Sequence, residues 1–101
     1  GRRLNACLTL AVMHQGAEIT TIEGLGSPEN LHPMQAAFIK HDGFQCGYCT
    51  PGIIMASEGL LQENPHPDEE EIKEALAGNY CRCISHYQVL EAVKQAAERR
   101  K

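Results

Sequence analysis

Apolar and polar positions follow a strand-like pattern first and a helical pattern later. Between residues 6 and 23, apolar residues alternate with small or polar ones, and Thr, Ile and Val are frequent, as in β-strands. The dipeptide Gln15-Gly16 separates two such runs and supplies a turn residue that tolerates a positive φ. We therefore predict a β-hairpin over residues 6–23, which needs a further element to pack on because an isolated hairpin is marginal in water. Residues 24–28 follow as a Gly-, Ser- and Pro-containing linker.

From residue 33 onward, apolar residues recur at helical spacing, and turn residues interrupt them three times. This pattern predicts four helices, over residues 33–41, 50–63, 68–77 and 85–101. Thr50 is the predicted N-cap of the second helix. Asp68 and Glu71 have the spacing of a capping box at the third helix, and Ser85 and Gln88 have it at the fourth.

The apolar stripes of these helices define the predicted core, because each helix buries one face against the others. The predicted core residues are Met34, Ala37, Phe38, Ile53, Ile54, Ala56, Leu60, Leu61, Ile72, Ala75, Leu76, Val89, Leu90, Val93, Ala96 and Ala97, with His41 at the edge. The predicted fold is mainly α, a four-helix bundle preceded by a β-hairpin.

Composition narrows the classes of function. The chain has 101 residues, a formal net charge of −4 and a pI near 5.7. A nucleic-acid partner is not expected, because phosphate binding usually needs a basic surface. No apolar run approaches the ~20 residues of a membrane-spanning helix, and no hydrolase triad or pair of carboxylates stands out. A domain this small often needs a covalent or metal staple, and the chain has five cysteines.

Four of these cysteines form two close pairs between predicted helices, Cys46-x2-Cys49 and Cys81-x-Cys83, whereas Cys7 stands apart. If the helices pack as two antiparallel pairs, both loops can lie at one end of the bundle and bring four sulfurs together. Paired thiols on two loops favour a metal site over isolated buried thiols or disulfides. Four thiolates suit structural zinc and a [2Fe-2S] cluster alike, so the spacing leaves both open.

Five motifs extend the interpretation. Residues 45–52 read QCGYCTPG and residues 78–83 read GNYCRC, while residues 5–11, 23–25 and 32–35 read NACLTLA, EGL and HPMQ. In this order they resemble the iron–sulfur subunit of the molybdenum hydroxylases, the family of xanthine dehydrogenase, aldehyde oxidoreductase and CO dehydrogenase. The first two motifs are similar to those of its helical cluster domain. The others are similar to the end of its ferredoxin-like domain, its linker and the start of its helical domain.

The resemblance implies two [2Fe-2S] clusters in the family's intact subunit. Cys46, Cys49, Cys81 and Cys83 match the ligands of the cluster in the helical domain. Cys7 matches the last ligand of the second, plant-type cluster, whose other three ligands this sequence lacks. Residues 1–26 are then expected to be the end of a ferredoxin-like (β-grasp) domain with its linker, and residues 27–101 the cluster-binding domain. The alternative for Cys7 is a small buried apolar residue on a strand.

The resemblance also implies an electron-transfer subunit of an oxidoreductase. Electrons would pass from a molybdopterin centre on a large subunit to the second cluster and to FAD on a medium subunit, in the cytoplasm. Gln45 and Cys83 would contact the pterin, although Gln45 also fits an ordinary polar loop position. The isolated chain is not expected to turn over substrate. A structural zinc-binding interaction module and a stand-alone enzyme are the alternatives.

One departure from the family pattern falls beside the second cysteine pair. Residues 84–86 (Ile-Ser-His) separate Cys83 from Tyr87, which is one residue more than the family commonly has. His86 could cover the cluster or face solvent. Arg82, between two of the predicted ligands, could offset their negative charge or contact a partner.

Overall fold

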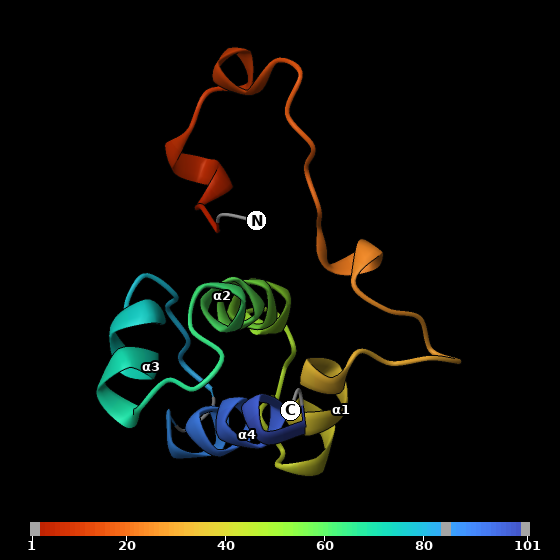
Figure 1. The fold of residues 1–101 in the computed structure, drawn as a ribbon, viewed down its shortest axis with the longest axis vertical. Coiled ribbons are helices and arrows are strands. Elements are labelled where there is room, and N and C mark those ends of the chain that lie inside the picture. The colour runs from red at the N-terminus through yellow and green to blue at the C-terminus, as the bar shows by residue number, and fades with distance from the viewer. Residues whose placement is uncertain (1–2, 84–85, 100–101) are drawn as a thin grey trace.

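Four helices gather into a bundle, and the N-terminal segment leaves it as an extended arm (Figure 1). The computed structural model describes residues 3–83 and 86–99. The helices are α1 (Pro33–Lys40), α2 (Thr50–Glu63), α3 (Glu69–Ala75) and α4 (His86–Arg99). Within the described residues, no helix combines the length and the apolar character needed to cross a bilayer.

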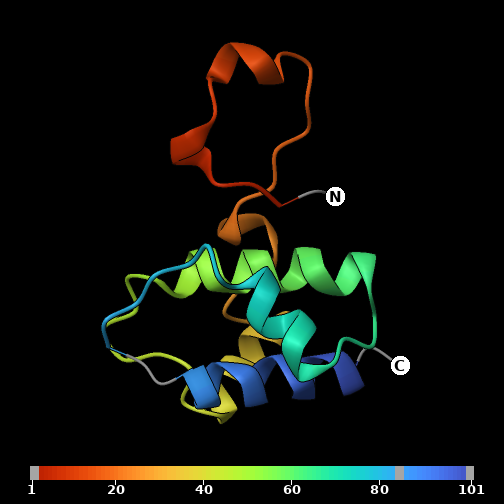
Figure 2. The same ribbon diagram turned by 90° about the vertical axis from the view of Figure 1, so that its left-hand side faces the viewer.

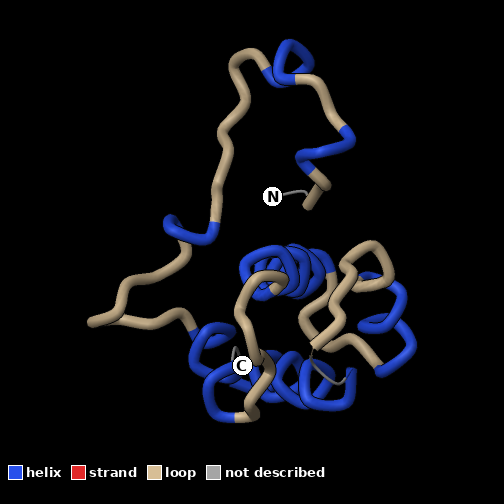
Figure 3. Tube along the Cα trace, turned by 180° about the vertical axis from the view of Figure 1, so that it is seen from behind, coloured by secondary structure: helices blue, strands red, loops and turns tan. Residues whose placement is uncertain are grey.

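The N-terminal arm does not form the predicted hairpin. It contains three short 3₁₀ turns, η1 (Ala6–Leu8), η2 (Ala11–His14) and η3 (Ile22–Gly24), joined by loops (Figure 3). In the described part of the chain there is no strand, only an isolated bridge between Ser27 and Asn30. A hairpin on its own is marginal in water, and the described residues offer it no further strand to pair with. Apolar side chains of the arm remain exposed, namely Leu4, Leu8, Leu10, Val12, Met13 and Ile19.

Helix α1 begins with a capping box that the sequence analysis missed. The His32 ring Nδ1 accepts a hydrogen bond from the Met34 N–H at 3.1 Å, and the His32 N–H donates to Gln35 Oε1 at 3.0 Å. Across the helix interface, His32 Nε2 lies 2.8 Å from a carboxylate oxygen of Glu58, a buried residue of α2. The start of α1 is thereby attached to the middle of α2. The cue in the sequence was Pro33 at the first helical position with Gln35 two residues later.

The predictions for the N-caps of the other three helices had different outcomes. Asp68 caps α3 through the predicted capping box with Glu71. Thr50 is not the N-cap of α2; it is the first helical residue, and Cys49 occupies the cap position without a side-chain hydrogen bond. The predicted cap Ser85 lies outside the described residues.

The predicted core is confirmed with small changes. Every predicted residue is buried except Ala75 and His41, which are half-buried, and Ala92 joins the core. Helix α2 also buries the polar residues Ser57 and Glu58, because it lies between the arm and the other helices (Figure 1). Its neighbours are α1, α3 and η3, while α4 packs chiefly on α1.

An ion pair joins the start of α3 to α4. Lys94 Nζ lies 2.8 Å from Glu69 Oε1, and this lysine holds the pKa of the Glu69 carboxyl below its usual value. Because the folded pKa is lower than the unfolded one, the pair stabilises the fold at pH values above the unfolded pKa near ~4.3, and this contribution is lost as the pH falls through the folded value.

We expect Lys94→Gln to raise the Glu69 pKa back towards its usual value, as measured by NMR titration of the side-chain carboxyl. Lys73→Gln is the matched control, because Lys73 makes the weakest contribution to the Glu69 shift. An unchanged Glu69 pKa in Lys94→Gln would contradict the pairing.

Candidate metal centre

Two cysteine-bearing loops lie side by side at one end of the bundle (Figure 2). One connects α1 to α2 and carries Cys46 and Cys49; the other connects α3 to α4 and carries Cys81 and Cys83. Helices α2 and α4 both begin at this end, so each loop leads directly into the start of a long helix. The prediction that both loops meet at one end is confirmed.

The first loop depends on two glycines. Gly47, between the two cysteines, has φ +83°, a conformation that strains residues with a Cβ atom. Gly43 lies against the Phe38 ring: a Cβ atom at this position would stand 2.7 Å from Phe38 Cδ2. The Gly43 N–H also donates to the Phe38 carbonyl at 2.8 Å, which turns the chain away from α1. The loop therefore starts from a fixed point in the core.

The four sulfurs form two pairs, each with one thiol from each loop. Cys83 Sγ lies 3.5 Å from Cys46 Sγ, and the Cys81 thiol is a hydrogen-bonding neighbour of Cys49. Within the second loop, the Cys83 N–H donates to Cys81 Sγ at 3.3 Å. The five cysteines form no disulfide bond, and the 3.5 Å contact is far longer than the ~2.05 Å of such a bond.

The Cys49 and Cys83 thiols are harder to ionise than an ordinary cysteine. Burial, followed by the neighbouring Cys81 thiol, raises the pKa of Cys49 to about 11. The hydrogen bond with Cys46 raises the pKa of Cys83 as well. Four thiolates this close would repel one another, so their ionised form needs positive charge among them. The electrostatics of the two pairs therefore suits a cationic metal group.

The donor set fits a two-iron cluster. A [2Fe-2S] core takes four thiolates, two for each iron. In the described residues no three His, Cys, Asp or Glu side chains are grouped so that they could hold one ion; the thiols are grouped two by two.

The other predicted residues have different surroundings. Gln45 is exposed beside Cys46. Cys7 is exposed in η1, on the arm beyond α2 and away from the two cysteine loops, so it is not a buried residue on a strand (Figures 1 and 2). The Arg82 guanidinium lies 6.0 Å from the centre of the Tyr80 ring. The side chain of His86 and residues 84–85 lie outside the described part of the chain, so the effect of the extra residue stays untested.

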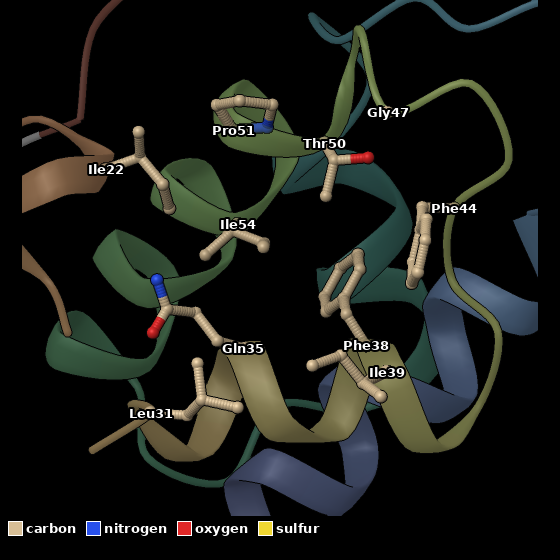
Figure 4. A pocket seen from close by; sticks show the side chains of 10 residues that line it. All are labelled: Ile22, Leu31, Gln35, Phe38, Ile39, Phe44, Gly47, Thr50, Pro51 and Ile54. Carbon is tan, nitrogen blue, oxygen red and sulfur yellow. The ribbon is translucent and has the colours of Figure 1, made fainter. Parts of the chain in front are cut away.

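An apolar pocket of about 320 Å³ lies behind the first cysteine loop (Figure 4). It is lined by Ile22, Leu31, Gln35, Phe38, Ile39, Phe44, Gly47, Thr50, Pro51 and Ile54. The sequence analysis did not predict it, because its walls come from η3, the segment before α1, α1, α2 and the loop between α1 and α2.

Comparison with known proteins agrees with this geometry. The sequence profile of the [2Fe-2S] binding domain family matches residues 21–94. The aldehyde oxidoreductase iron-sulfur-binding subunit PaoA of Escherichia coli K12 is 60% identical over 112 aligned positions, which cover 96% of this chain and 49% of that protein. The nicotine 6-hydroxylase small subunit of Paenarthrobacter nicotinovorans is 46% identical over 96 positions, with 95% and 58% coverage. The chain thus spans only about half the length of these curated relatives.

A solved crystal structure is also similar to this chain over nearly its whole length. The crystal structure of quinoline 2-oxidoreductase from Pseudomonas putida 86 superposes with a TM-score of 0.87 at 40% identity, covering 96% of this chain and 62% of that one. The family profile spans most of the sequence, and both cysteine loops fall inside it. The chain therefore belongs to the family of [2Fe-2S] binding domains found in the iron–sulfur subunits of the molybdenum hydroxylases.

Proposed function

We propose that this chain is the electron-transfer part of a molybdenum hydroxylase, and that Cys46, Cys49, Cys81 and Cys83 hold its [2Fe-2S] cluster. The observation that carries the proposal is the pairing of thiols across two loops at one end of the bundle. When bound, a cluster of this kind accepts and passes on one electron without bonding to the substrate.

The protein's contribution is to hold these sulfurs in place. Cys49 occupies the cap position of α2, whose apolar face is in the core, so this thiol is attached directly to a packed helix. The Cys83 N–H directed at the Cys81 sulfur adds a donor of the kind that tunes the potential of such clusters. The isolated chain has no expected substrate chemistry of its own.

Partners are proposed from the surface around the thiols. Tyr48, Tyr80 and Tyr87 are all strongly exposed at this end, and Tyr48 reaches 93% exposure. The Arg82 guanidinium lies over the Tyr80 ring, and tyrosine and arginine are residue types enriched at protein interfaces. We propose that a molybdopterin-binding large subunit covers this surface, and that exposed Gln45 and Cys83 approach the pterin there.

The N-terminal arm is proposed to belong to a different domain from the helical bundle. We propose that residues 1–26 end a ferredoxin-like domain and that Cys7 is a ligand of a second [2Fe-2S] cluster, which passes electrons on to FAD in a medium subunit. The exposed apolar side chains of the arm support this division, because they need a further domain to cover them. A cytoplasmic location stays a prediction.

The test is the metal content of the purified full-length protein. We expect a red-brown protein with iron and acid-labile sulfide, visible absorption, and an EPR signal after reduction with dithionite. The zinc alternative predicts a colourless protein with stoichiometric zinc, and that result would overturn the proposal. Residual turnover by the chain alone, with a small substrate and an artificial acceptor, would instead support a stand-alone enzyme.

A further inference from the structure

The Thr50 hydroxyl is buried without a hydrogen-bond partner. Its Oγ1 is shielded from solvent and has no partner within the described residues. A buried hydroxyl is normally satisfied, because an unmade hydrogen bond costs about 1–3 kcal/mol. Thr50 is also not the N-cap of α2, so helix capping does not account for it. The Thr50 hydroxyl is therefore a hydrogen-bond donor without an acceptor among the described residues.

The two branches of the Thr50 side chain have different surroundings. In Figure 4 the methyl group points towards the apolar pocket, while the hydroxyl points away from it, towards the side where the loop with Gly47 runs. Thr50 directly follows Cys49 in the chain, and its hydroxyl is close enough to the Cys49 sulfur to interact with it. The Cys49 sulfur is thus the candidate acceptor for the Thr50 hydroxyl.

We infer that the Thr50 hydroxyl donates a hydrogen bond to the Cys49 sulfur when that sulfur is a cluster ligand, and that it raises the reduction potential of the cluster. A neutral thiol is a weak acceptor, whereas a metal-bound thiolate is a strong one. One-electron reduction adds one negative charge to the cluster, and a donor at sulfur stabilises the more negative state. No proton is transferred. The inference rests on the proposed [2Fe-2S] site and concerns how that site is tuned.

The experiment measures the midpoint potential of this cluster in the purified full-length protein, by EPR-monitored titration with dithionite. Thr50→Val removes the hydroxyl and keeps the branched shape that faces the pocket. We expect the equilibrium constant for reduction to fall by up to about tenfold, which corresponds to about 59 mV for a one-electron couple. Thr50→Ser keeps the hydroxyl and should retain most of the wild-type potential.

Ser57→Ala is the matched control. Ser57 Oγ is the other buried hydroxyl of α2 without a partner in the described residues, and it lies about two helical turns from Thr50. Its loss removes a comparable buried polar group far from the thiols, so the potential should not move. If Thr50→Val does not keep its cluster, Thr50→Ala takes its place with the same expected fall.

The outcomes separate this inference from the proposed function. Equal potentials in wild type and Thr50→Val, or equal shifts in the valine and serine variants, would overturn the role of the hydroxyl while leaving the cluster assignment intact. A wild-type protein without iron and labile sulfide would overturn the proposed function itself, and the inference with it.

Discussion

Cys49→Ser is expected to abolish the binding of the cluster proposed for the helical domain. Cys49 supplies one of the four thiols and is paired with Cys81 from the other loop. Serine cannot ionise near neutral pH and is a poor ligand for iron, so a three-thiol site should lose the metal. In the 101-residue chain, iron content, visible absorption and the EPR signal should all fall to the background level. The two loops should also lose the link between them, since the metal is their proposed bridge.

Cys7→Ser is the control for this loss in the 101-residue chain. Cys7 lies on the arm, away from the two loops, and is not one of the four proposed ligands (Figure 1). Its substitution should leave the iron content and spectrum of the helical domain unchanged. Bleaching by Cys7→Ser, or an unaltered spectrum in Cys49→Ser, would show that the ligand assignment is wrong.

Phe38→Ala is expected to lower the free energy of unfolding by about 3–5 kcal/mol. Phe38 is the largest fully buried side chain of the core, at 1% exposure, and its ring fills the space beneath Gly43 at the root of the first cysteine loop. Its removal leaves a cavity that the packed helices cannot close completely. Urea unfolding followed by circular dichroism measures the change.

Ile39→Ala tests whether this loss reflects burial rather than position in the helix. Ile39 is the next residue of α1 and is 54% exposed. Its truncation should cost less than about 1 kcal/mol, because the lost side chain was mostly in water already. Similar losses in the two variants would contradict the packing of α1 described above.

The arm and the core show where sequence reasoning fails and where it succeeds. The four helices and nearly all core residues could be predicted, because helical periodicity and caps such as Asp68 with Glu71 depend on neighbours a few residues away. The hairpin prediction was not confirmed, because a hairpin is stable only when a further element packs on it, and the apolar side chains of the arm stay exposed. In its place the arm makes local bonds, such as the Met13 N–H to the Leu10 carbonyl at 3.0 Å.

Contacts between distant residues explain the features that sequence reasoning missed. His32 caps α1 and also pairs with Glu58, and the second of these contacts spans two helices. Thr50 was predicted as a cap from its residue type, but the loop geometry assigns that position to Cys49 and leaves the Thr50 hydroxyl without a partner. The apolar pocket likewise needs five segments of the chain to form its walls.

The residues available for chemistry, and the loops that carry them, could be identified from the sequence alone. Two close pairs of cysteines between helices already predicted a metal site, since a pair such as Cys46 and Cys49 is set by its own short loop. How the pairs combine, Cys46 with Cys83 and Cys49 with Cys81, is seen only in the folded chain. The two pairs lie on loops far apart in the sequence, and these loops meet because α2 and α4 pack with their first residues at the same end of the bundle.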